Sequence, residues 1–123
     1  MATRRFVVPA VGDASGDGTF YTPYISGFIE KIQYVKTDYA DTVDFTITAE
    51  ATGETIWTEA NVTASAIKHP RAATHSTAGV ASVYVAAGSA VLDYVALGRD
   101  RVKIVIATAG VSKTGSFTVT VRE

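Results

Sequence analysis

A turn-rich loop near the start of the chain places oxygen-bearing side chains at a spacing known from calcium sites. Asp13, Ser15, Asp17 and Gly18 match the first, third, fifth and sixth positions of a helix–loop–helix calcium loop. Tyr24 stands where that loop needs a bidentate glutamate, and no helical pattern flanks it. An ordinary Asp/Gly turn is favoured, and calcium binding at Asp13 and Asp17 stays an open alternative.

The histidines are the next candidates for chemistry. The chain has only two, His69 and His75, and it has no cysteine. A zinc site needs at least three protein ligands, so carboxylates would have to come from elsewhere in the fold. We therefore interpret both as loop histidines at a surface or subunit contact, and we predict no metal and no cofactor.

Two short motifs are shared with serine penicillin-binding enzymes. They are Ser65 with Lys68, and the Lys113-Thr114-Gly115 run. The third motif of those enzymes is missing, the first is not on a helical pattern, and no serine stands in a nucleophile-elbow context. We predict that the protein is not an enzyme.

Aromatic and basic side chains remain as candidates for binding. Trp57 and six tyrosines could stack on sugar rings, but they are spread along the chain, which favours core and interface packing. Arg4 and Arg5 suit the solvated end of a strand, with pairing to a neighbour's carboxylates as the alternative.

The elements that position these residues are predicted to be strands. In residues 42–50 Val43, Phe45, Ile47 and Ala49 alternate with polar residues, and a turn containing Gly53 leads to the β-branched and aromatic run 55–58, which indicates a hairpin. Further strands are expected over 4–8 (ended by Pro9), 19–24, 28–36 (with a bulge near Glu30), 81–86, 90–97 (followed by a turn at 98–100), 101–108 (covered on both faces) and 116–122.

About eight short strands without a helical pattern predict an all-β protein: a single-domain antiparallel β-sandwich over residues 1–123, jelly-roll-like. Residues 1–25 would form an N-terminal strand and arm docking on a neighbour. The long stretch 59–79 lacks strand periodicity, which is typical of a loop that contacts something. The candidate partner-interface residues are Arg4, Arg5, Trp57, His69, Arg71 and His75.

Composition narrows the classes of partner. The formal net charge of −1 over 123 residues gives no general attraction to nucleic acid or an anionic membrane. The apolar run after Arg5 is too short for a signal peptide or a membrane span, so synthesis in the cytoplasm is expected.

Several runs of the chain share a pattern with a known family: residues 32–36, the run TVDFTITAEATGETIW, residues 91–95, Gly98 and the run VKIVIATAGVSKTGSFTVTV. They resemble small bacteriophage proteins encoded among head genes, the capsid decoration or cement proteins. The resemblance covers residues 26–123. It implies a non-enzymatic virion protein on the capsid surface, made in the host bacterial cytoplasm, usually a homo-trimer, whose partner is the major capsid protein. A tail or neck component, or a carbohydrate- or cell-surface-binding module, is the alternative.

Overall fold

The computed structural model describes residues 2–123, and their secondary structure consists of ten strands and the segments that join them. Eight strands are four to twelve residues long, and two have three residues each. The strands are β1 (Thr3–Val11), β2 (Gly18–Tyr21), β3 (Ile25–Lys36), β4 (Asp44–Ala49), β5 (Thr55–Glu59), β6 (Ala66–Lys68), β7 (Arg71–Ala73), β8 (Leu92–Asp100), β9 (Val102–Ala107) and β10 (Thr114–Arg122).

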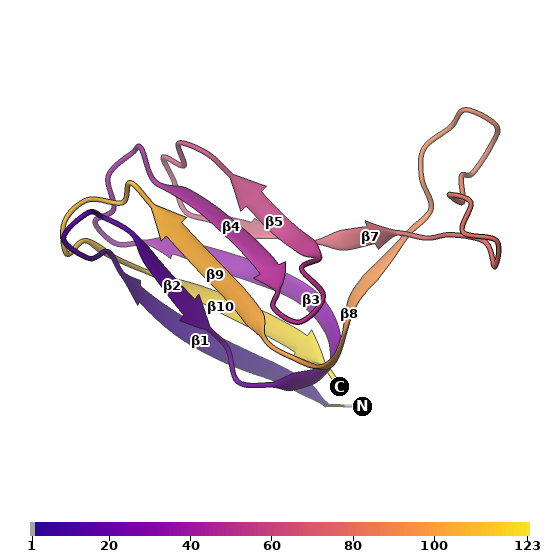
Figure 1. Cartoon of the computed structure of the whole chain (residues 1–123), viewed down its shortest axis with the longest axis horizontal. Coiled ribbons are helices and arrows are strands. Elements are labelled where there is room, and N and C mark those ends of the chain that lie inside the picture. The colour runs from indigo at the N-terminus through magenta and orange to yellow at the C-terminus, as the bar shows by residue number, and fades with distance from the viewer. Residues whose placement is uncertain (1) are drawn as a thin grey trace.

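The strands form two antiparallel sheets packed face to face (Figure 1). Sheet A has the order β1-β10-β3-β8-β7, with β6 also paired to β3, and sheet B has the order β2-β9-β4-β5. The pairs are nested: β1 with β10, β2 with β9, β3 with β8, and β4 with β5. This is the topology of a jelly roll, a long hairpin rolled into two layers. The predicted all-β sandwich is confirmed.

Alternating apolar side chains from both sheets form one core. Its centre is aromatic: the Phe45 ring lies 5.0 Å from Tyr34, 5.2 Å from Phe117 and 4.8 Å from Trp57, measured between centroids. Rings at these spacings attract one another in addition to excluding water. The core therefore locks sheet B, which carries Phe45 and Trp57, onto the centre of sheet A.

Two local predictions are confirmed by the register. The hairpin of β4 and β5 turns at Gly53, whose φ of 74° suits a residue without a Cβ. In β3 the partner of Thr120 is Lys31 and the partner of Val121 is Ile29, so Glu30 is the extra residue of a bulge. The bulge lets Ile29 and Ile32 both face the core, where each is fully buried.

Five predictions about the strands are wrong. The stretch 59–79, predicted to be a loop without strands, contains β6 and β7, which pair with β3 and β8. β1 continues through Pro9 because it is an edge strand, where a missing amide on the open side breaks no ladder bond. β8 runs to Asp100 without the predicted turn at 98–100. β9 is covered on one face only, since Val105 on the other face is half-exposed. Residues 81–86 form no strand, because they lie in a loop that leaves the body and has no sheet beside it (Figure 1).

Candidate functional site

The outer face of sheet A carries four basic side chains: Arg5, Lys31, Arg71 and Arg122. The register places Arg5 beside Thr120, and Thr120 beside Lys31, in one row across β1, β10 and β3. Arg122 lies in the next row, paired to Phe28, and Arg71 of β7 pairs with Tyr94 of β8. Among the described strand residues of this face, Glu30 is the acidic one.

The Tyr94 ring on β8 is a shared contact of Arg71, Arg122 and Phe28 on this surface. The guanidinium of Arg122 lies 4.4 Å from the Tyr94 ring centroid, and Phe28 meets the same ring edge-on at 6.3 Å. The Glu30 carboxylate lies 3.6 Å from Arg122 Nε. Arg71 Nη1 donates to the backbone oxygens of Glu30 at 3.1 Å and of Pro70 at 2.8 Å. Arginine and tyrosine packed in this way are typical of protein-binding surfaces.

An open cleft of about 320 Å³ lies between β5 and β6, at one side of the sandwich. Ile56, Trp57 and Pro70 form its apolar lining, and the exposed side chains of Lys68 and His69 stand at its rim. Trp57 itself is only 8% exposed, and its Nε1 donates to Glu59 Oε1 at 2.9 Å. Trp57 is thus a wall of the cleft and part of the core, and it offers no open ring face of the kind on which a sugar stacks.

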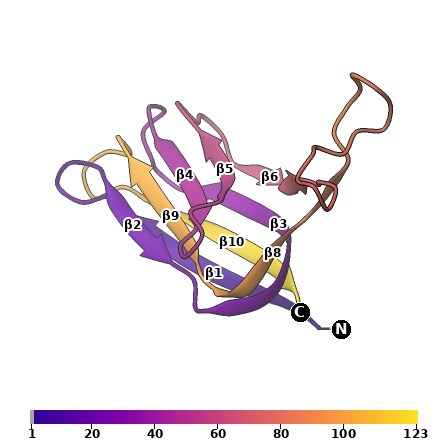
Figure 2. The same cartoon turned by 45° about the vertical axis from the view of Figure 1, so that its right-hand side comes forward.

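Beyond the cleft the chain leaves the sandwich. Residues 74–91, here called the projecting loop, extend past β7 and β8 away from both sheets (Figures 1 and 2). Isolated bridges between His75 and Ala81 and between Val83 and Ala90 hold the projecting loop together. The projecting loop carries the exposed side chains of Val80, Tyr84 and Val85.

The structure thus brings some of the predicted interface residues together and separates others. Trp57 and His69 share the cleft, Arg71 follows at the base of the projecting loop, and His75 lies in that loop. Arg5 is on the outer face of sheet A. Arg4 is on the same strand, where its Nε lies 3.5 Å from a carboxylate oxygen of Glu123.

Sequence reasoning missed Tyr94, Arg122 and the exposed apolar side chains of the projecting loop. Two signals were present. The alternation of residues 116–122 puts Arg122 on the polar face of its strand, and residues 72–92 contain no Asp, Glu, Lys or Arg. The sequence does not show that β10 pairs with β3 and β7 with β8. This pairing places the guanidiniums of Arg122 and Arg71 against the Tyr94 ring.

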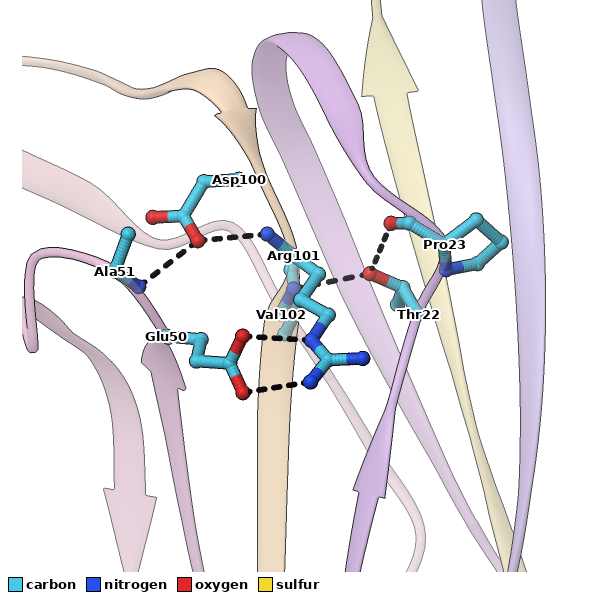
Figure 3. A network of polar contacts seen from close by, with 7 residues as sticks. All are labelled: Thr22, Pro23, Glu50, Ala51, Asp100, Arg101 and Val102. Atoms are coloured by element: carbon cyan, nitrogen blue, oxygen red, sulfur yellow. Dashed lines mark hydrogen bonds and ion pairs between the residues drawn. The ribbon is translucent and has the colours of Figure 1, made fainter.

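The densest polar cluster lies where β8 passes into β9, beside the turn between β4 and β5, and is shown in Figure 3. Arg101 Nε and Nη2 donate to the two carboxylate oxygens of Glu50 at 2.7 and 2.9 Å. Asp100 Oδ1 accepts from the backbone amides of Ala51 at 2.9 Å and Arg101 at 2.7 Å. Thr22 Oγ1 accepts from the amide of Val102 at 3.0 Å. The cluster joins three loops.

Charges in this cluster follow from its hydrogen bonds. The bonds from Arg101 lower the pKa of Glu50, and the Glu50 carboxylate raises the pKa of Arg101. The Arg101 guanidinium also lies 3.9 Å from the Tyr21 ring centroid. The carboxylates of Glu50 and Asp100 are therefore bonded to groups of the chain itself and stabilise these loops.

The loop of Asp13 and Asp17 is an Asx-type turn. Asp13 Oδ1 accepts from the amides of Ser15 at 2.8 Å and Asp17 at 3.0 Å, and these bonds lower the pKa of Asp13. Asp17 Oδ1 accepts from the amide of Thr108 at 3.2 Å. Within residues 2–123 no three His, Cys, Asp or Glu side chains are grouped as metal ligands. The same residues contain no helix long and apolar enough to cross a membrane.

Comparison with known proteins gives a match in structure. No family model matches the chain, and no curated protein matches it. A chain from the solved structure of the cyanophage Pam1 capsid asymmetric unit is similar over 97% of this chain and 81% of its own length, with a TM-score of 0.51 and 16% identity. The likeness establishes the fold.

Proposed function

We propose that this protein is a structural component of a phage virion: a non-enzymatic decoration protein on the outer capsid surface that stabilises contacts between capsomers. Its partner would be the major capsid protein, and the protein would act as a homo-oligomer, a trimer. The observation that carries the proposal is the likeness of nearly the whole chain to a chain from a phage capsid asymmetric unit.

The outer face of sheet A is the surface that suits docking on a shell. Arg5, Lys31, Arg71 and Arg122 give this face a local positive charge, although the chain as a whole has a formal charge of −1. Such a surface fits an acidic region of a capsid subunit. Charge complementarity of this kind sets orientation and association rate more than affinity.

A decoration protein stabilises a shell through mass action. Each copy that binds the assembled lattice better than free capsid protein shifts the equilibrium toward the assembled state. A modest affinity per site then suffices, because the same contact repeats across the lattice.

The experiment uses purified shells that lack this protein. Adding the wild-type chain should give stoichiometric binding and raise the temperature at which shells rupture. A variant with Arg5→Glu and Lys31→Glu should bind more weakly, and the salt dependence of binding should fall with it. Lys103→Glu, a single charge reversal on the outer face of sheet B, is the control and should bind like wild type.

Two results would contradict the proposal. The first is a rupture temperature that stays the same at saturating protein with no stoichiometric binding. The second is a position of the chain on a tail or neck in images of the native particle. Binding that weakens equally in the Lys103→Glu control would reject the outer face of sheet A as the docking surface.

A further inference from the structure

Two positive charges are held against one aromatic ring on the outer face of sheet A. The guanidinium carbons of Arg71 and Arg122 lie 4.1 and 4.4 Å from the centroid of the Tyr94 ring. The two arginines belong to β7 and β10, strands that are far apart in the sequence, and the ring belongs to β8. Like charges held this close repel each other unless an anion lies between or beside them.

The acidic residues nearby compensate this pair only in part. The Glu30 carboxylate lies 3.6 Å from Arg122 Nε, which is longer than a hydrogen bond, and this buried Nε has no hydrogen-bond partner among the described residues. Arg71 Nη1 is bonded to backbone oxygens, which carry no net charge. Asp93 precedes Tyr94 on β8 and therefore points to the opposite face of the strand. The two guanidiniums and Glu30 together keep an excess positive charge.

The two arginines are also accessible to another molecule. The Arg122 side chain is 31% exposed, and Phe28, whose ring meets Tyr94 edge-on at 6.3 Å, is 45% exposed. Guanidiniums beside an aromatic rim have the composition of interface hot spots, in which arginine and tyrosine are enriched. Arg5 and Lys31 lie in the next row of the same face and extend its positive charge.

We propose that Arg71 and Arg122 with Tyr94, here called the arginine cluster, bind a carboxylate side chain from an acidic segment of the capsid protein. A planar guanidinium holds a carboxylate through two parallel N–H···O bonds, which a lysine ammonium cannot form. The charge of the face argues for this occupant, because Arg5 and Lys31 then lie beside further acidic residues of the same segment. The inference rests on the proposed function for the identity of the partner, and it adds which residues hold that partner.

The arginine cluster and the charges around it are expected to act on different rates. Long-range attraction by exposed charges raises the association rate, whereas a charge that is hydrogen-bonded in the interface sets the dissociation rate. Arg122→Gln should therefore raise the rate at which the protein leaves the shell. Arg5→Gln should lower the association rate and leave the dissociation rate nearly unchanged.

Peptide binding to the isolated chain tests the arginine cluster without shells. The probe is a short synthetic peptide rich in Glu, and the same peptide with Gln in place of Glu is its control. Only the Glu peptide should shift the Arg122 Nε–H resonance in NMR spectra. Arg122→Gln should weaken binding of the Glu peptide by about tenfold or more, the scale of an interface hot spot. Arg122→Lys keeps the charge and should restore only part of the affinity.

Arg4→Gln is the matched control variant. It removes an arginine whose Nε also lies near a carboxylate, 3.5 Å from Glu123, and it should bind the Glu peptide nearly as the wild type does. Circular dichroism and thermal melting of each variant should match the wild type, so that a loss of binding reports on the surface and not on the fold.

Four results would overturn the inference. They are equal binding of the Gln peptide, wild-type affinity in Arg122→Gln, an oligonucleotide of the same charge that binds as tightly as the Glu peptide, and self-association that Arg122→Gln abolishes. The third would mean that nucleic acid fits this surface as well as a protein does. The fourth would place a second copy of this chain on the arginine cluster.

The peptide and shell experiments fail independently of each other. If Arg122→Gln leaves the shell with the wild-type dissociation rate, the arginine cluster is not the docking residue set, and the proposed function still stands. If the chain binds the Glu peptide through Arg122 and does not bind shells, the proposed function is contradicted, and the carboxylate specificity of the arginine cluster is supported.

Discussion

The guanidinium carbon of Arg71 lies 4.1 Å from the centroid of the Tyr94 ring. This contact anchors the base of the projecting loop to the outer face of sheet A. Arg122 lies over the same ring, which links the anchor to β10 in the middle of the sheet. Rigidity of the loop should therefore depend on residues far from its tip.

Tyr94→Ala should loosen the projecting loop without unfolding the sandwich. The substitution removes the ring that both guanidiniums contact, and cation–π contacts of partly exposed groups are worth about 0.5–2 kcal/mol. Hydrogen exchange of residues 74–91 should accelerate while that of β9 stays unchanged. Tyr84→Ala, within the loop, is the control and should leave exchange near Arg71 unaffected. An unchanged exchange rate in the Tyr94 variant would show that the backbone bonds alone hold the loop.

The ion pair of Glu50 and Arg101 should make stability depend on acid pH. The pKa of Glu50 is lowered in the folded protein by the hydrogen bonds from Arg101, relative to an ordinary value of 4.5. The ion pair therefore contributes fully to the stability of the fold above pH 4.5. This contribution is lost as the pH falls through the pKa that Glu50 has in the folded protein. The difference in Tm between wild type and Glu50→Gln should be largest near neutral pH and shrink below pH 4.5. Glu54→Gln, in the adjacent turn, removes an exposed carboxylate outside the ion pair and is the control.

The two core tyrosines should respond oppositely to loss of their hydroxyls. Among the described residues the Tyr34 hydroxyl is buried without a hydrogen-bond partner, and burial raises its pKa to about 12. The Tyr39 hydroxyl donates to the backbone oxygen of Ala10. Tyr34→Phe should therefore be neutral or stabilising, whereas Tyr39→Phe should lower the free energy of unfolding by about 1 kcal/mol. Urea denaturation measures both, and equal losses would mean that Tyr34 has a partner in solution.

Gly115→Ala should be one of the most damaging small substitutions. A Cβ at Gly115 would overlap the ring of Tyr39, which is held in the core and cannot move aside. Overpacking of this kind costs about 1–3 kcal/mol in the free energy of unfolding. Gly98→Ala is the matched control, because a Cβ there meets nothing within 4 Å, and its effect should be about 0.5 kcal/mol or less. A mild Gly115 variant would imply that β10 shifts relative to Tyr39.

The sequence by itself determined the local structure of most strands. Alternation of apolar and polar residues predicted β4 and β9, Gly53 predicted the hairpin turn, and the broken alternation of residues 28–36 predicted the bulge at Glu30. These features depend on neighbours within a few residues, because side chains in a strand alternate with a period of two wherever one face is buried.

Only the tertiary structure decided which strands pair, which side chains share a surface, and where a predicted strand does not form. Nothing near residues 81–86 indicates that they leave the body, since a run of Ala, Val and Tyr becomes a strand only where another strand lies beside it. In the same way, Arg71 and Arg122 reach one tyrosine ring because β7, β8, β3 and β10 lie side by side in sheet A. Strand pairing depends on packing between segments that are distant in the chain, so a local sequence pattern does not determine it.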